Sequence, residues 1–369
     1  MTKKVFGYIV CALLFGHINA QNITLKEAFK DKFLIGAALN TWQVNSDDYQ
    51  IRNIIDNEFS AIVAENCMKS MYIQPQEGKF NFNQADQFVD LGERNGQFVV
   101  GHCLIWHSQL PRWFLIDSLG NTVSAELLKN RIINHVTTVV KRYKGRVKGW
   151  DVVNEAVENN GEMRQSPFYR ILGEAFIEIA FKAAHEADPD AELYYNDYSL
   201  HIPEKRNAVI NLVKRLKDRG CKIDAIGMQS HMDFDVSLEE YEKSIEAFAS
   251  IGCKVMATEL DVSPLPSPKG NFGAAVETEV EYQEILNPYV NGLSEEAEKQ
   301  LTDYFCNLFD IYLKHADVIT RVNFWGVTDA DSWKNNFPIR GRTDYPLAFD
   351  RMKQPKPFVK IIKQMAINR

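Results

Sequence analysis

Short apolar runs alternate with amphipathic stretches along nearly the whole chain, and this alternation restricts the possible folds more than any other feature. Eight runs have the length and composition of buried strands: 33–39 (FLIGAAL), 61–64 (AIVA), 97–106 (QFVVGHCLIW), 147–153 (VKGWDVV), 191–197 (AELYYND), 223–230 (IDAIGMQS), 253–260 (CKVMATEL) and 320–327 (TRVNFWGV). Between them, stretches such as 124–145 and 206–220 have apolar residues at helical spacing and contain a glycine at or near their ends. Eight strand–helix units predict an α/β fold, a single-domain (β/α)8 TIM barrel.

A doubly wound open sheet is the alternative architecture for this pattern. No glycine-rich phosphate loop follows the first strand run, which disfavours it. The chain has no internal repeat and no Ser/Pro/Gly linker, and its longest excursion, 262–294, follows the seventh strand run. In a barrel, such a loop is expected on the face that carries the active site.

The first twenty residues differ in composition from the rest of the chain. Lys3 and Lys4 precede the apolar run VFGYIVCALLFG, which is too short to span a bilayer, and small residues precede Gln21. This pattern predicts a signal peptide at 1–20 and a catalytic barrel domain at 21–369. We therefore expect export to the periplasm or the extracellular space, without a membrane anchor.

Charge and cysteine content exclude several classes of protein. The formal net charge of −7 argues against a nucleic-acid partner and suits a neutral substrate. Five cysteines remain after residue 20 and no CxxC pair occurs, so neither a disulfide scaffold nor a zinc ribbon is predicted. Cys221 and Cys253 each follow a glycine ahead of neighbouring strand runs, and we expect two buried thiols rather than a disulfide.

Polar side chains gather at the C-terminal ends of the strand runs and not at the N-terminal ends. The C-terminal ends of parallel barrel strands meet at one mouth, so these side chains should converge on a single site. Seven of the eight runs contribute: Glu65, Asn66 and Lys69; His102, Trp106 and His107; Asn154 and Glu155; Asn196 and Asp197; Gln229 and His231; Glu259 and Asp261; and Trp325.

Two glutamates at such strand ends suit glycoside hydrolysis, in which one carboxyl group donates a proton and the other acts as an anion. Asp261 shares a strand face with Glu259, and His231 ends the neighbouring strand, so a chain Glu259–His231–Asp261 should keep Glu259 ionised. Glu155 then takes the acid role. Strict alternation would aim Asn154 and Glu155 to opposite faces, so we expect a bulge or sharp turn there.

Aromatic residues in the strand-end loops favour a sugar-binding cleft, because flat rings match the apolar faces of pyranoses. Trp106, Trp113, Trp325 and Trp333 are the four tryptophans so placed. A zinc hydrolase with His102, His107 and His231 as ligands is the rival chemistry. The sequence contains no HxH or HExxH motif, and a zinc mechanism would leave both glutamates unused.

The motifs ENCMK, GHCLIWHSQLPRWF, WDVVNEAV, LYYNDYS, IGMQSH, ATELDV and FWGVTDADSW, in this order, resemble those of family 10 glycoside hydrolases, the endo-1,4-β-xylanases. The resemblance runs from about residue 27 to the end of the chain. It implies endo-acting hydrolysis of internal β-1,4-xylosidic bonds by a retaining double displacement. Glu155 would be the acid/base, Glu259 the nucleophile, and Asn154 the contact to the sugar 2-hydroxyl.

The resemblance also implies the substrate-binding set and a cis peptide between His102 and Cys103. Besides Asn154, the expected substrate-binding residues are Glu65, Asn66, Lys69, His102, Trp106, Gln109, Gln229, Trp325 and Trp333. Ser70 departs from the family pattern, in which a tryptophan often follows the lysine, and the 262–294 loop is long and acidic. Both departures concern the outer subsites rather than the chemistry.

Two other functions remain open at this stage. One is a catalytically dead sugar-binding barrel or an inhibitor, whose signature would be the loss of a glutamate. The other is a related barrel glycosidase that acts on β-mannan or β-glucan. We expect xylan and xylo-oligosaccharides as partners, no cofactor or metal, no nucleic acid, and no implied protein partner.

Overall fold

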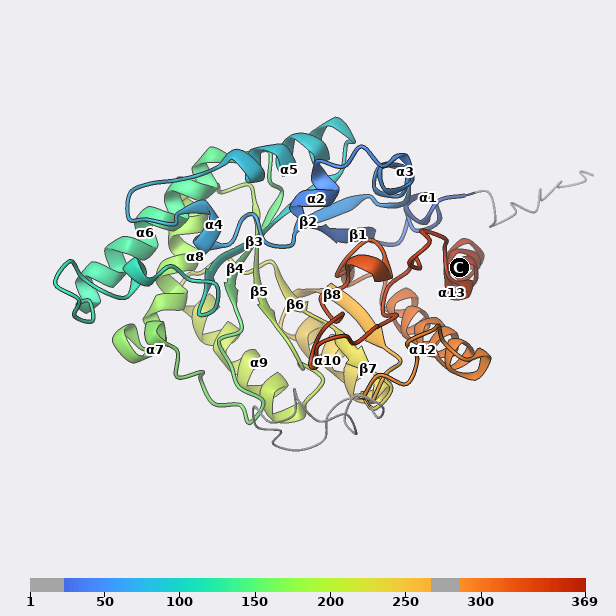
Figure 1. Cartoon of the computed structure of the whole chain (residues 1–369). Coiled ribbons are helices and arrows are strands. Elements are labelled where there is room, and N and C mark those ends of the chain that lie inside the picture. The colour runs from blue at the N-terminus through green and yellow to red at the C-terminus, as the bar shows by residue number, and fades with distance from the viewer. Residues whose placement is uncertain (1–22, 267–285) are drawn as a thin grey trace, which may run out of the picture.

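In the computed structural model, eight parallel strands close into a barrel with helices packed around the outside (Figure 1). The structure describes residues 23–266 and 286–369. The expected signal peptide and much of the 262–294 loop lie outside the described residues. Among the residues described, no helix has the length and apolar composition needed to cross a membrane.

The barrel strands coincide closely with the eight predicted runs, so the TIM-barrel prediction is confirmed. They are β1 (Leu34–Leu39), β2 (Ala61–Ala64), β3 (Phe98–Trp106), β4 (Gly149–Asn154), β5 (Glu192–Asp197), β6 (Ala225–Met228), β8 (Lys254–Ser263) and β9 (Ile319–Phe324). Pairing of β1 with β9 and of β6 with β8 closes the ring. The strands are buried almost throughout, as expected for a parallel sheet covered on both faces.

A short additional strand, β7 (His231–Asp233), differs from the prediction of one continuous sixth run at 223–230. The run ends as a strand at Met228, and Ser230 adopts a left-handed backbone with φ 65°. The chain then pairs again with β8, with His231 opposite Asp261. This break brings His231 next to the end of β8.

The helices follow from their apolar stripes and their capping residues. They are α1 (Leu25–Ala28), α2 (Thr41–Val44), α3 (Tyr49–Glu58), α4 (Ser70–Ile73), α5 (Asn83–Arg94), α6 (Ala125–Arg142), α7 (Pro167–Leu172), α8 (Ala175–Ala187), α9 (Pro203–Asp218), α10 (Leu238–Ser250), α12 (Glu295–Lys314) and α13 (Pro357–Asn368), with 3-10 turns at Arg112–Phe114 and Asp329–Asp331. Ser124 caps α6 by accepting a hydrogen bond from Leu127 N, and Pro203 opens α9 at a position where its missing N–H costs nothing.

Two apolar clusters hold the fold. The larger one fills the space between the strands and the surrounding helices. The smaller one lies among strand residues and includes Val63, Val100, Tyr194 and Met256. Gly149 makes room for Tyr194, because a Cβ there would lie 2.1 Å from the Tyr194 hydroxyl oxygen. This packing fills the middle of the barrel and leaves the strand ends free to form a site.

Candidate active site

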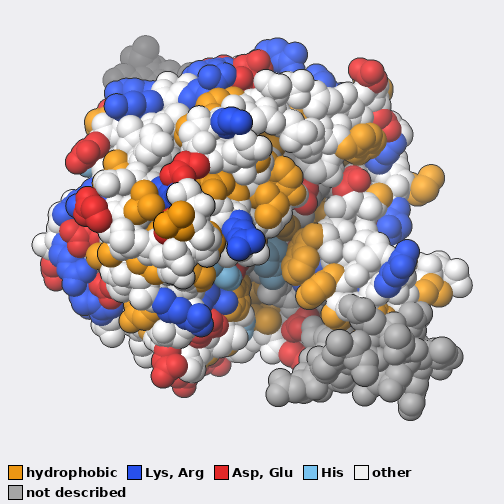
Figure 2. Space-filling view, turned by 60° about the vertical axis from the view of Figure 1, so that its left-hand side comes forward, with side chains coloured by type: hydrophobic (Ala, Val, Ile, Leu, Met, Phe, Trp, Pro, Cys, Tyr) orange, Lys and Arg blue, Asp and Glu red, His pale blue; other side chains and the backbone are white. Residues whose placement is uncertain are grey.

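A cavity of about 470 Å³ opens among the C-terminal ends of the barrel strands. Figure 2 shows a hollow with histidine side chains at its floor and hydrophobic side chains on its flanks. The expected site residues that line the cavity are Glu65, Asn66, Lys69, His102, Trp106, Gln109, Asn154, Glu155, Gln229, His231, Glu259, Trp325 and Trp333. Asp261, which was expected to support Glu259, is fully buried and hydrogen-bonds His231.

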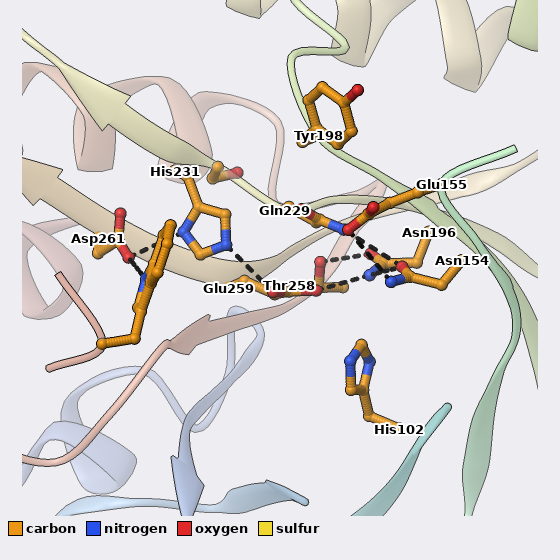
Figure 3. A network of polar contacts seen from close by, with 12 residues as sticks. His102, Asn154, Glu155, Asn196, Tyr198, Gln229, His231, Thr258, Glu259 and Asp261 are labelled. Carbon is orange, nitrogen blue, oxygen red and sulfur yellow. Dashed lines mark hydrogen bonds and ion pairs between the residues drawn. The ribbon is translucent and has the colours of Figure 1, made fainter. Parts of the chain in front are cut away.

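Glu259 is held by donors on two sides (Figure 3). Its carboxylate accepts a hydrogen bond of 2.8 Å from Asn196 Nδ2 and lies 3.1 Å from His231 Nε2. His231 Nδ1 in turn lies 2.8 Å from Asp261 Oδ2, which also accepts from Trp333 Nε1 at 2.8 Å. The predicted chain Glu259–His231–Asp261 is therefore present in the structure.

The electrostatics of this chain favour an ionised Glu259. Burial alone would raise the pKa of Glu259, but the hydrogen bond from His231 and the nearby histidine charges outweigh it and lower the pKa. Burial would lower the pKa of His231, but Asp261 and Glu259 outweigh that effect and raise it to about 9. The pKa of Asp261 is lowered because His231 and Lys334 outweigh its burial. The three groups thus form an anion–cation–anion chain at neutral pH.

Glu155 points into the same cavity from the end of β4. Its carboxylate accepts hydrogen bonds from Trp106 Nε1 at 3.0 Å and Gln229 Nε2 at 3.0 Å, and from its neighbour Asn154 at 3.3 Å. Its backbone has φ 58°, and the β4–β5 register shifts between Asp151 and Val153. The expected irregularity is therefore present, and it turns Asn154 and Glu155 toward the same cavity.

Amide side chains connect the two glutamates. Asn196 Nδ2 donates both to Glu259 and to Asn154 Oδ1, the latter at 2.9 Å, and Gln229 Nε2 lies 3.2 Å from the same Asn154 oxygen. Thr258 Oγ1 donates to Asn196 Oδ1 at 2.6 Å, which fixes the orientation of that amide. The amides therefore hold fixed positions between the two carboxylates.

A second polar group forms one wall of the cavity. The buried Lys69 ammonium donates to Asn66 Oδ1 at 3.0 Å and to Gln109 Oε1 at 2.8 Å, and it lies 4.9 Å from the centre of the Trp106 ring. Asn66 Nδ2 donates to Glu65 Oε1 at 3.1 Å, and burial raises the pKa of Glu65. These side chains offer donors and acceptors for sugar hydroxyls beside an aromatic face.

His102 stands on the cavity floor and is fixed from behind. Its Nδ1 lies 2.8 Å from Asp151 Oδ2, so Nε2 is the ring nitrogen available to a ligand. This contact gives Asp151, which is buried within the barrel, a structural role in holding the imidazole. The peptide bond between His102 and Cys103 is cis, as the family resemblance implied.

The expectation for Trp113 was wrong. Its indole Nε1 donates to Gln74 O at 2.8 Å, its ring stacks on Phe114, and Arg131 lies over it at 5.6 Å. Trp113 therefore packs between the loops that follow β2 and β3, outside the residues lining the cavity. His107 is also absent from the lining and contacts the Trp106 ring edge-on.

Two cavity residues, Tyr198 and Ser199, were missed as site residues. Asn196, which was expected to converge on the site, bridges Glu259 and Asn154. Tyr198 and Ser199 follow the fifth strand, and the motif LYYNDYS that contains them was the available signal. Their position after a buried strand could have added them to the predicted set.

The histidines of the zinc alternative do not form a metal site. Across residues 23–266 and 286–369, the one grouping compact enough to hold a metal ion is Glu242, Glu246 and His315, on α10 and at the end of α12. Cys221 and Cys253 are both free and buried, as expected. The cavity chemistry is therefore that of carboxylates and amides.

A parallel barrel with two carboxylates and several tryptophans at its mouth defines the class of barrel glycoside hydrolases. Comparison with known proteins identifies the family. The family model of glycosyl hydrolase family 10 matches residues 24–365, and the chain belongs to that family.

Two related proteins and one solved structure match the chain over nearly their full lengths. Endo-1,4-beta-xylanase A of Xylanibacter ruminicola is 52% identical over 340 residues, covering 92% of each protein. An endo-1,4-beta-xylanase of Geobacillus stearothermophilus is 38% identical, covering 90% of this chain and 96% of the relative. The solved structure of a family 10 endoxylanase retrieved from a sugarcane soil metagenome matches with a TM-score of 0.87 and 42% identity, over 93% of this chain and 99% of the other.

Proposed function

We propose that this protein is an endo-1,4-β-xylanase that cleaves internal xylosidic bonds of xylan with retention of anomeric configuration. The observation that carries the mechanism is the contrast between the two glutamates. Glu259 is backed by an imidazole and a second carboxylate, whereas the carboxylate of Glu155 accepts its hydrogen bonds from the neutral side chains of Trp106, Gln229 and Asn154. The relatives of this protein that are named endo-1,4-beta-xylanase support the choice of xylan as substrate.

The reaction proceeds in two displacements at the anomeric carbon. Glu259 attacks that carbon while Glu155 gives its proton to the departing glycosidic oxygen, so a glycosyl ester forms and the C–O bond to the leaving sugar breaks. Glu155, now ionised, then takes a proton from water, and the water oxygen displaces Glu259. Both carboxyl groups return to their starting states.

The amides and the Lys69 group would position the sugar rings. Asn154 contacts the 2-hydroxyl at the cleaved bond, where hydrogen bonds strengthen in the transition state. The cavity wall of Glu65, Asn66, Lys69 and Gln109 would take the hydroxyls of the next ring. Trp325 and Trp333 would supply apolar faces.

A side-by-side assay on xylan, β-mannan and cellulose tests the substrate. We expect rapid loss of viscosity and release of reducing ends from xylan alone. Preferred cleavage of mannan or cellulose would assign the protein to another barrel glycosidase activity. Inactivity on all three, with a folded protein, would favour the sugar-binding alternative.

We also propose that residues 1–20 direct export and are removed, so that the mature chain begins at Gln21. The support is the Lys3–Lys4 start followed by an apolar run too short for a membrane span. N-terminal sequencing of the protein recovered from the periplasm or medium tests this. A mature protein that retains Lys3 and Lys4 would contradict it.

A further inference from the structure

The acid/base residue sits on a backbone conformation that non-glycine residues seldom adopt. Glu155 has φ 58°, in the left-handed region, which is strained for a residue with a side chain. Such a conformation persists only where the surroundings fix it. One fixing contact is the hydrogen bond from Glu155 N to Asn196 O at 2.9 Å.

Arg164 holds the other side of this residue. Its Nε donates to the backbone oxygen of Glu155 at 2.8 Å, and its own backbone N–H donates to Ala156 O at 2.8 Å. The same guanidinium donates through Nη2 to the Tyr198 hydroxyl at 2.6 Å. One rigid group therefore joins the backbone carbonyl of the acid/base to a side chain that lines the cavity.

The charge of Arg164 is balanced locally. Its Nη1 lies 3.2 Å from Glu158 Oε1, and its side chain is 19% exposed. The guanidinium bonds to the main chain of Glu155 and not to its carboxylate. The geometry is therefore that of a group that orients the acid/base rather than one that forms an ion pair with it.

The neighbouring peptide groups are fixed from β5. Ala156 N donates to the Tyr195 hydroxyl at 3.2 Å, and Val157 N donates to Asp197 Oδ2 at 3.3 Å. The carbonyl oxygen of Glu155 instead accepts its hydrogen bond from Arg164. Without Arg164, the peptide between Glu155 and Ala156 loses the contact that opposes its rotation.

We propose that Arg164 is a positioning residue that aims the Glu155 carboxyl at the glycosidic oxygen and joins its position to that of Tyr198. This inference rests on the proposed function, because it assigns Glu155 the acid/base role. A planar guanidinium presents several donors in a fixed fork, whereas a lysine ammonium cannot reproduce that geometry. Arg164→Lys should therefore restore charge without restoring full function.

A leaving-group series isolates this role. We would measure kcat/KM of Arg164→Met and Arg164→Lys on aryl β-xylobiosides whose phenols range from dinitrophenol to unsubstituted phenol. Dinitrophenol leaves without a proton, so its kcat/KM should stay within about twofold of wild type. For phenol, misplaced acid catalysis should lower kcat/KM by on the order of 10²-fold, the lower end of general acid contributions.

Arg215→Met is the matched control. Arg215 also forms a close ion pair, 2.6 Å from Glu174 Oε2, but it lies on outer helix α9. It should leave the leaving-group dependence unchanged. If Arg164→Met does not fold, Tyr198→Phe carries the test, since it removes only the hydroxyl that holds the guanidinium and should steepen the same dependence.

The leaving-group series distinguishes a failure of the Arg164 proposal from a failure of the proposed substrate. An equal loss of kcat/KM for all leaving groups, or no loss for phenol, would overturn the proposal. A wild-type enzyme that cleaves no aryl xylobioside but cleaves aryl cellobioside or mannobioside would refute the proposed substrate alone. The same series on the accepted glycoside would then decide the role of Arg164.

Discussion

At the scale of single residues, the site depends on how a few buried groups share protons and charge. His231 lies between Glu259 at 3.1 Å and Asp261 at 2.8 Å, and its pKa is raised to about 9. The sequence predicted this chain because Asp261 follows Glu259 by two residues on one strand and His231 ends the neighbouring run. The spacing of residues could not show that Trp113 lies outside the cavity, because periodicity says nothing about where a loop side chain points.

The raised pKa of His231 predicts a specific loss of stability in alkali. The pKa of a histidine in the unfolded chain is about 6.5. The contribution of His231 to the unfolding free energy is therefore fully present below that pH and is lost as pH rises through about 9. The loss should be roughly 3 kcal/mol, as expected for a shift of this size. Urea unfolding between pH 6 and 10 measures it.

His231→Gln should remove this pH dependence and lower stability near neutrality. His315→Gln is the control, because His315 lies outside the cavity, at the end of α12. A His231→Gln protein that loses as much stability between pH 6 and 10 as wild type would show that His231 carries no such charge.

At the scale of elements, the strands were predictable within a few residues, whereas their irregularities were not. A run of apolar residues shows that a strand is buried, but a break such as that at Ser230 depends on how the chain packs against β8. The turn at Glu155 was predictable because two adjacent residues had to face one cavity. Its geometry depends on β5, whose residues Tyr195 and Asp197 bind the following peptides.

The contact between β5 and α9 includes a buried ion pair whose loss should be severe. Lys205 Nζ lies 2.8 Å from Asp197 Oδ1, and both side chains are fully buried. Lys205→Met should lower the unfolding free energy by about 3–5 kcal/mol at pH 8, because Asp197 stays buried without its cation. Equilibrium urea unfolding is the measurement.

The pH dependence identifies the cause. Burial raises the pKa of Asp197 to about 6, above its unfolded value, so ionisation of Asp197 opposes folding as pH rises. In Lys205→Met that pKa should rise further, so the deficit should be smaller at pH 5 than at pH 8. The double variant Lys205→Met/Asp197→Asn should lose the same unfolding free energy at pH 5 and at pH 8, because it has no carboxylate at position 197. If Lys205→Met itself lost the same unfolding free energy at both pH values, the buried charge of Asp197 would not be the cause.

At the scale of the whole molecule, the barrel is closed by elements from the two ends of the chain. β1 pairs with β9, and α1 packs against α13, where Lys363 Nζ donates to Ile23 O at 2.9 Å (Figure 1). The number of strand–helix units predicted this closure, since eight units suffice for a ring. Which aromatic rings would meet across the closure was not predictable, because side-chain packing is set by the assembled fold.

Phe358 tests the packing of the C-terminal helix α13 against α12. It is buried on α13, and its ring stacks on Phe305 of α12 at 3.9 Å between centroids. Phe358→Ala should lower the unfolding free energy by about 3–5 kcal/mol, as for other large core deletions, while the catalytic rate at 25 °C stays near wild type. Thermal unfolding and an activity assay check both parts; a rate loss without a loss of stability would contradict this account.

The assignment of the two glutamates is the central claim, and azide rescue of Glu155→Ala tests it most directly. Glu155→Ala should form the glycosyl-enzyme from dinitrophenyl β-xylobioside, which needs no acid, and then stall because no base activates water. Azide needs no base, so it should restore turnover and yield a β-glycosyl azide, whereas Glu259→Ala should lack the nucleophile and stay inactive on xylan. An α-glycosyl azide from Glu155→Ala, identified by NMR of the product, would contradict the assigned roles.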